Sequence, residues 1–235
     1  MALEGKKDFS GELQILIPES LQVAQSQGID EAILLLLSFE KKCRLNNDFH
    51  SLKEICLHVI RLCKQFNDWE KVNSMLSILN KRRAQNKLTI TAIVNEAMTY
   101  LDETPSKEEK ISLIKTLMAI CEGKIYVEAE SARLHLILAF IYEQDGDINA
   151  ACATIQDVHV ETYGSIPREE KAEYIYHQTR FNILNKDFVR ALIQSRKMNR
   201  FGPLPLPPLL PSSSLLLEKL SRNQISKKSK LNFII

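Results

Sequence analysis

Apolar residues recur along the chain at the spacing of one face of a helix. One stripe begins at Leu52 and continues with residues three, four, seven, eleven and fourteen positions later, which is the period of an amphipathic helix. Similar stripes begin at Trp69 and at Leu113. Residues 134–140 are apolar on nearly every side, which predicts a helix with neighbours on several sides.

A short pattern also recurs at intervals of about forty residues. It consists of Gly or Asp, an apolar residue, two variable positions and a small or apolar residue, and its copies begin at Gly28, Asp68, Asp147 and Asp187. An Asp in this place is typical of the residue that caps the start of a helix. Near residue 107 the pattern is replaced by Ser106-Lys107-Glu108-Glu109, which has the form of a capping box.

We therefore predict an all-α fold, a right-handed solenoid of antiparallel helix pairs, over residues 18–200. A compact helical bundle is the alternative architecture. Residues 1–17 are predicted to be a flexible N-terminus. The five predicted pairs are 18–27 with 29–45, 49–66 with 69–85, 88–103 with 107–122, 125–144 with 148–159, and 166–185 with 188–199.

The character of the chain changes after Arg200. Five of the eight prolines lie between Pro203 and Pro211, and proline cannot continue a helix because it lacks the backbone donor. Residues 201–235 also hold five Lys and Arg residues against the single acidic Glu218. We predict that this segment is a basic, Pro-rich, disordered tail.

Composition narrows the function classes. Only 7 of 235 residues are Gly, which disfavours a turn-rich β fold. The net charge is +2, and the tail supplies more than all of it, so the first 200 residues are slightly acidic. A nucleic-acid partner is therefore disfavoured. The longest apolar runs, Ile33–Phe39 and Leu134–Tyr142, are too short to span a membrane.

No candidate for catalysis or cofactor binding emerges. The five cysteines are odd in number and contain no CxxC pair, which indicates a reducing, cytoplasmic or nuclear location. The best metal candidates are His50, Cys56, His58 and Cys63. On a helix His58 would point about 200° away from Cys56. We therefore interpret Cys56 and Cys63 as core residues, and we predict no enzyme, no metal and no cofactor.

Two polar segments are candidate partner contacts. One is the basic cluster Lys81, Arg82 and Arg83, for which the plain alternative is a set of cations favoured at a helix C-terminus. The other segment runs from residue 124 to residue 133, and its candidates are Lys124, Tyr126, Glu128, Glu130 and Arg133. Its plain alternative is a helix start with solvated charge pairs such as Lys124 with Glu128. The predicted structural anchors are Trp69, Cys56, Cys63 and Phe140.

Several segments resemble one known family. The most specific is Glu122-Gly123-Lys124-Ile125-Tyr126-Val127-Glu128-Ala129-Glu130-Ser131-Ala132-Arg133-Leu134, and it is accompanied by residues 77–85, 113–117, 146–147, 160–165 and 195–199. Together they resemble the fifth non-ATPase subunit family of the proteasome regulatory particle, PCI-domain scaffolds of the lid. The resemblance covers most of residues 30–200.

The resemblance implies that the helical repeats form a tetratricopeptide-like array, the N-terminal array of PCI proteins. It also implies a non-catalytic scaffold in ubiquitin-dependent protein degradation. Its implied partners are other lid subunits, including the deubiquitinase subunit, and the core particle. The resemblance stops near Arg200, where the family would continue to a winged-helix PCI module. We therefore expect a truncated chain without that module, with a genuine short paralogue as the alternative. A scaffold of another PCI complex, such as the signalosome or a translation initiation factor, and an RNA-binding helical repeat remain as alternative functions.

Overall fold

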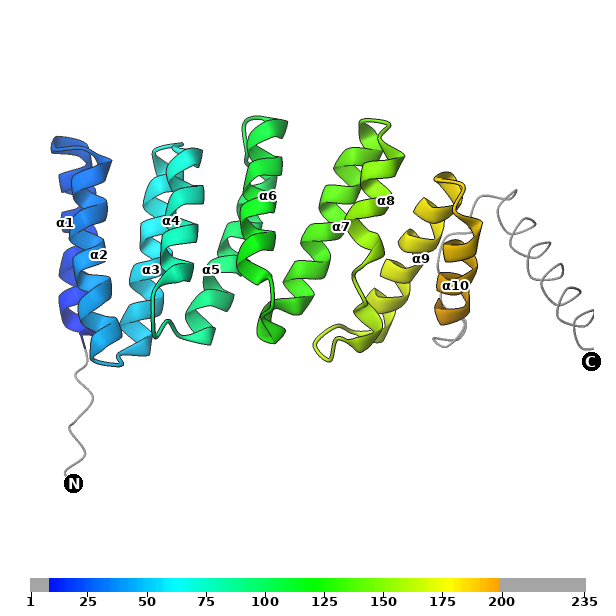
Figure 1. Ribbon diagram of the computed structural model, residues 1–235. Helices are drawn as coiled ribbons and strands as arrows, with labels where there is room; N and C mark the ends of the chain where they lie inside the picture. The colour runs from blue at the N-terminus through cyan, green and yellow to red at the C-terminus, as the bar shows by residue number, and fades with distance from the viewer. Residues whose placement is uncertain (1–8, 199–235) are drawn as a thin grey trace, which may run out of the picture. The chain divides into compact units, whose positions relative to one another are not determined.

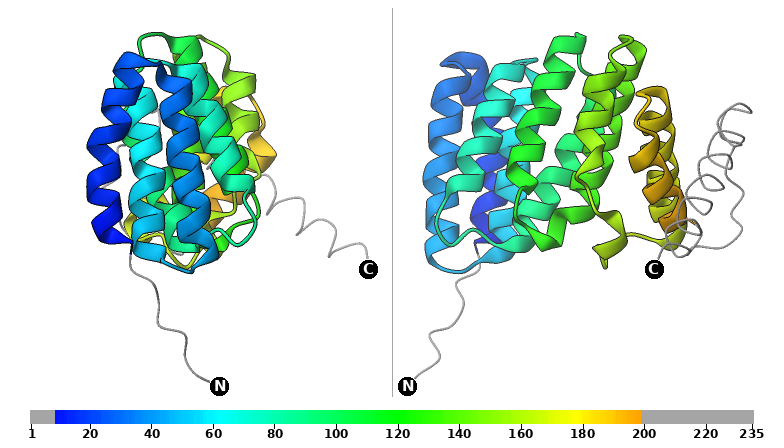
Figure 2. Two further views of the ribbon diagram at one scale, coloured as in Figure 1. Left: turned by 90° about the vertical axis from the view of Figure 1, so that its left-hand side faces the viewer. Right: turned by 45° about the vertical axis from the view of Figure 1, so that its right-hand side comes forward.

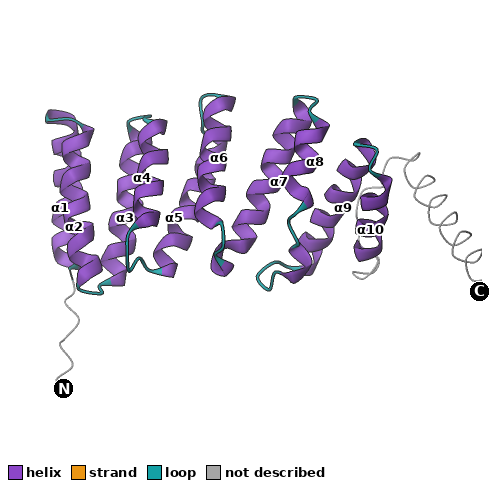
Figure 3. Cartoon of the chain, in the orientation of Figure 1, coloured by secondary structure: helices purple, strands orange, loops and turns teal. Residues whose placement is uncertain are grey.

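The computed structural model describes residues 9–198, and every regular element within them is a helix (Figure 3). The chain forms two compact units, Met1–Ser131 and Ala132–Ile235, here called the N-terminal and the C-terminal unit. Each is described by itself. The predicted tail 201–235 lies outside the described residues.

The N-terminal unit is a succession of antiparallel helices (Figures 1 and 2). Helix α3 packs against α1, α2, α4 and α5, and α4 packs against α6. Helix pairs thus repeat through this unit, as the sequence predicts. Its elements are α1 (Ser10–Ser26), α2 (Ile29–Leu45), α3 (Phe49–Gln65), α4 (Trp69–Lys81), α5 (Lys87–Thr99), η1 (Tyr100–Asp102), α6 (Lys107–Cys121), η2 (Ile125–Val127) and the first turn of α7 (Glu128–Gln144).

The C-terminal unit contains the remainder of α7, then α8 (Ile148–Gln156), η3 (Val160–Thr162), α9 (Arg168–Leu184) and α10 (Phe188–Met198). Helix α9 packs against both α8 and α10. The buried Gln178 of α9 donates its amide hydrogens to the carbonyls of Ile155 and Val158, at 2.7 and 2.9 Å. The Ile155 carbonyl lies in the last turn of α8, where carbonyls have no partner inside the helix, and the Val158 carbonyl lies just after α8.

Four tight turns between helices share one geometry. In each turn, the residue before the capping Asp has a positive φ, between 54° and 79°. These four residues are Asn47, Asn67, Gly146 and Lys186. The amide of the following Asp donates to a carbonyl five residues earlier, as in a Schellman motif. The Asp side chain then accepts from the amide three residues later, at 2.9–3.2 Å. The recurring Asp therefore serves both the end of one helix and the start of the next.

Several predicted helix boundaries are wrong, most clearly the start of α1 and the end of α4. Helix α1 begins at Ser10 and not at residue 18, so residues 10–17 are not a flexible segment. The buried Phe9 holds this start, because its ring packs edge-on against Phe39 and its amide donates to Asp48 at 2.9 Å. Helix α4 ends at Lys81 and not at residue 85.

The predicted anchors differ in burial. Trp69 is 5% exposed, and Cys56 and Cys63 have no exposed surface. Phe140 is only partly buried, and its ring meets His177 edge-on with centroids 4.9 Å apart. Burial raises the pKa of Cys63 and of Cys121 to about 12, so these thiols are inert at neutral pH.

Candidate protein-binding surface

The linker between α4 and α5 carries the basic cluster. Arg82 has an extended backbone, with φ −65° and ψ 132°, which ends α4. Arg44 of α2 donates to the carbonyl of Arg83 at 2.9 Å and to Glu40 at 2.8 Å. Glu40 is fully buried. A buried ion pair therefore fixes the backbone of this linker, while its side chains lie nearer the solvent.

The cations of this linker have no acidic partners among residues 9–198. The neighbouring cations Arg61, Lys64 and Lys71 each pair with a carboxylate, at 2.7, 2.5 and 2.9 Å. Lys81, Arg82, Arg83 and Lys87 form no such pair within the described part of the chain. Positive charge that the fold itself does not neutralise is thus concentrated at the end of α4.

The linker between α6 and α7 lies at the same end of the N-terminal unit (Figure 1). Gly123 turns the chain with φ 70°, and the Lys124 amine donates to the carbonyl of Ile120, the position where a cation stabilises a helix C-terminus. Val127 is fully buried, whereas Ile125 is 80% exposed. Contacts of Lys124 and Val127 therefore hold this linker on either side of Ile125, whose apolar side chain is exposed to solvent.

The remaining predicted contact residues divide between the two units. Tyr126, Glu128 and Glu130 are half-buried, and burial raises the pKa of the Tyr126 hydroxyl. Arg133 belongs to the C-terminal unit, where it makes a two-pronged ion pair with Glu170, at 2.6 and 2.9 Å. This pair lowers the pKa of Glu170. Arg133 therefore joins α7 to α9, a role that its sequence context did not indicate.

Two exposed apolar residues were missed by sequence reasoning: Leu88 follows the basic linker in the sequence, and Ile125 lies in η2, which packs against α5. Leu88, at the start of α5, is 72% exposed, and Ile125 is 80% exposed. Both lie outside the apolar stripes of the neighbouring helices. An apolar residue outside a stripe is the feature of the sequence that could have indicated their exposure. We call Lys81, Arg82, Arg83, Leu88 and Ile125 the linker surface. These exposed apolar side chains and unpaired cations are the residues of this unit that we consider as candidate contacts for another protein.

Other kinds of site find no support in the described residues. Residues 9–198 contain no group of three or more His, Cys, Asp or Glu side chains placed to hold a metal ion. None of the helices in that range has the length and apolar character that a bilayer crossing requires.

Comparison with known proteins identifies the family. Residues 31–201 match the family described as PSMD12/CSN4, N-terminal, and the chain belongs to it. The 26S proteasome non-ATPase regulatory subunit 12 of Dictyostelium discoideum is 42% identical over 182 residues, which cover 77% of this chain and 41% of that protein. The 26S proteasome regulatory subunit RPN5 of Saccharomyces cerevisiae is 34% identical over 198 residues, covering 83% and 44%.

The chain thus spans less than half the length of these relatives. The family resemblance drawn from the sequence is confirmed. Among solved structures, the crystal structure of BtubC (BKLC) from P. vanneervenii aligns with a TM-score of 0.40 at 14% identity, covering 84% of this chain and 93% of that chain. That likeness is too low to bear on function.

Proposed function

We propose that this chain acts as a non-catalytic scaffold within the lid of the proteasome regulatory particle and supports ubiquitin-dependent protein degradation through protein–protein contacts. The observation that carries the proposal is the 42% identity to a non-ATPase regulatory subunit over 182 residues. The names of the relatives favour this function over a scaffold of another PCI complex. The fold suits the role, because stacked helix pairs present extended surfaces for partners.

The proposed partners are other lid subunits, including the deubiquitinase subunit, and the core particle. The proposed location is the cytoplasm and the nucleus, where a reducing environment keeps the buried thiols free. Within the chain, the linker surface is the proposed contact region. Ile125 and Leu88 would supply apolar contact, and the unpaired cations Arg82 and Arg83 would supply charge complementarity.

A tagged pull-down from native eukaryotic extract tests the proposal. The chain carries an affinity tag, the bound proteins are identified by mass spectrometry, and the tag alone serves as the control. We expect proteasome lid subunits to be enriched. Enrichment of signalosome or translation-factor subunits would favour the alternative scaffold, and recovery of RNA-binding assemblies that RNase treatment removes would favour the RNA-binding alternative.

A further inference from the structure

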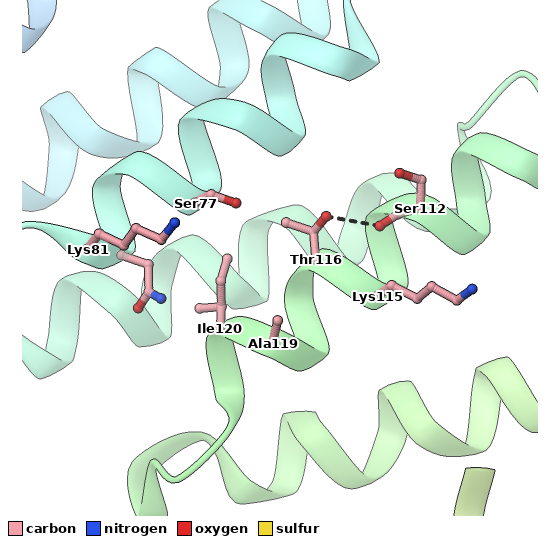
Figure 4. Close-up of a pocket in the computed structure, with 8 residues that line it drawn as sticks. Ser77, Lys81, Ser112, Lys115, Thr116, Ala119 and Ile120 are labelled. Carbon is pink, nitrogen blue, oxygen red and sulfur yellow. Dashed lines mark hydrogen bonds between the residues drawn. The ribbon is translucent and has the colours of Figure 1, made fainter. Parts of the chain in front are cut away.

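A groove lies between α4 and α6 on the N-terminal unit (Figure 4). Its volume is about 440 Å³, which is within the range of about 300–1,000 Å³ typical of ligand sites. A single bound water or small ion needs only about 30 Å³. The lining residues are Ser77, Asn80, Lys81, Ser112, Lys115, Thr116, Ala119 and Ile120.

The lining is rich in hydrogen-bond donors and contains no carboxylate. Lys81 and Lys115 are exposed, and neither forms an ion pair within residues 9–198. The amide oxygen of Asn80 is buried without a partner, so it can accept a hydrogen bond from a backbone N–H of a bound chain. Ala119 and Ile120 supply an apolar part of the wall. A groove lined by hydrogen-bond donors and cations, without an acidic side chain, suits a negatively charged ligand.

The two lysines come from different helices of the groove, Lys81 from α4 and Lys115 from α6. Figure 4 shows Lys81, with Ser77, at one end of the drawn side chains and Lys115 at the other, with Thr116 between them. The Thr116 hydroxyl already donates to the carbonyl of Ser112 at 3.0 Å, so its oxygen remains free to accept a hydrogen bond from a peptide N–H. A ligand with separated negative charges and backbone amides between them matches this order of groups.

The groove lacks the features of a nucleic-acid site. Single-stranded nucleic acids bind where aromatic side chains stack on the bases, and no aromatic residue lines the groove. The two helices that form it pack against each other, and Asn73 of α4 donates to the Ser112 hydroxyl at 3.4 Å. A groove with lysines on both helices and no aromatic residue fits an acidic peptide better than it fits stacked bases.

From these observations we propose that the α4–α6 groove binds an extended acidic segment of a partner protein, with carboxylates of that segment on Lys81 and Lys115. The groove shares Lys81 with the linker surface, whereas Lys115 and the rest of the groove wall lie outside that surface. This binding site is a property of the isolated chain, so it stands or falls independently of membership in the proteasome lid.

The test uses the full chain and a display library of short random peptides. We expect the selected peptides to be enriched in Asp and Glu. A synthetic peptide of the consensus sequence is then measured by fluorescence anisotropy beside its counterpart with Gln and Asn in place of the acids. The counterpart should bind at least about tenfold more weakly, since each tenfold step corresponds to one modest ionic contact.

Matched variants assign the binding to the groove. The double variant Lys81→Gln with Lys115→Gln should bind the acidic peptide at least about tenfold more weakly than the wild type does. Ala119→Phe fills the groove without changing its charge, and it should weaken binding of the acidic peptide as well. The control is Lys41→Gln with Lys186→Gln, which removes two exposed lysines elsewhere and should leave the affinity unchanged. Circular dichroism verifies that all variants keep the helical fold.

Three results would overturn the proposal. The first is a selection without acidic enrichment, and the second is an affinity that is unchanged in the double lysine variant. The third is tighter binding of a single-stranded RNA of similar length with the same dependence on Lys81 and Lys115, which would assign the groove to nucleic acid.

Discussion

At the scale of single residues, the ion pair between Glu40 and Arg44 has the greatest structural consequence. Glu40 is fully buried and the Arg44 side chain is 11% exposed, so each charge depends on the other. We expect Arg44→Met to destabilise the chain by about 3–5 kcal/mol, because it leaves a buried carboxylate without a partner. The double variant with Glu40→Gln should recover at least half of the loss.

Chemical denaturation measures both variants. A loss below about 1 kcal/mol for Arg44→Met would mean that water reaches Glu40 in solution. Since Arg44 also holds the carbonyl of Arg83, the double variant keeps most of the stability while it frees the linker. The double variant therefore shows whether partner binding depends on the position of the basic cluster, at nearly unchanged stability of the N-terminal unit.

His177 gives the C-terminal unit a dependence on pH. Its ring lies between Phe140 and Tyr176, and Glu173, Glu143 and Arg180 are the charged groups near it. Burial, aided by Arg180, lowers the pKa of His177 to about 4, and its Nδ1 is buried without a partner. The neutral ring is therefore the form that the folded chain holds.

Because the unfolded chain binds this proton near pH 6.5, stability should fall as the pH decreases from about 6.5 towards 4, by about 1–2 kcal/mol after solvent screening. His177→Gln should flatten this part of the profile. Glu161 and Glu170, whose pKa values are lowered, contribute stability that is lost only below their ordinary range near 4.5. An unchanged profile in His177→Gln, measured by denaturation at each pH, would contradict the assignment.

At the scale of elements, the turns between helices set the repeat. Three of the four turns with a capping Asp place Asn or Gly at the positive φ, but the turn before α10 places Lys186 there, with φ 61°. This backbone conformation costs a residue with a Cβ about 1–2 kcal/mol of conformational free energy. We expect Lys186→Gly to raise the free energy of unfolding by up to about 1 kcal/mol.

Lys41→Gly is the matched control for this variant, because Lys41 is exposed within α2 and Gly inside a helix should cost about 1 kcal/mol. Opposite signs for the two Lys→Gly changes in thermal denaturation are the expected result. A loss of stability in both variants would mean that the Lys186 side chain contributes a contact that outweighs its backbone strain.

The sequence predicted the helices well where side-chain pattern and capping agree. Asp68, Asp147 and Asp187 cap helices as the repeat indicates. Asp48 belongs to the same set, and the motif Asp48-Phe49-His50-Ser51-Leu52 fits the pattern, but it falls halfway between two copies of the forty-residue repeat and was missed. The pattern therefore marks tight turns both within pairs and between them.

The ends of α1 and α4 could not be predicted because long-range contacts decide them. Residues 82–85 are good helix formers, so propensity gives no stop signal. The helix nevertheless ends at Lys81, where Arg44 binds the carbonyl of Arg83 and the Gln85 amide donates to the carbonyl of Leu79 at 3.3 Å. Likewise, Pro18 lies inside α1, and the start of that helix depends on contacts of Phe9 with residues far along the chain.

At the scale of the whole molecule, the distribution of charge links the fold to the proposed role. The net charge of +2 conceals an uneven surface, because Arg61, Lys64 and Lys71 of the N-terminal unit pair with carboxylates, whereas the cations near the end of α4 have no such partner among residues 9–198. The candidates Lys81, Arg82 and Arg83 could be read from the sequence as a cluster. Their lack of acidic partners within residues 9–198, and the exposure of Leu88 and Ile125, required the three-dimensional structure.

The measurement that tests the central claim most directly is the recovery of proteasome lid subunits by the tagged chain, compared with a variant of the linker surface. Quantitative mass spectrometry follows the wild-type chain, Ile125→Asp with Arg83→Glu, and the control Lys186→Gln. We predict that lid subunits are recovered by the wild type and the control and are reduced at least about tenfold in the linker variant. Absence of lid subunits from the wild-type sample would contradict the proposed scaffold function, and equal recovery by the linker variant would contradict the proposed contact surface.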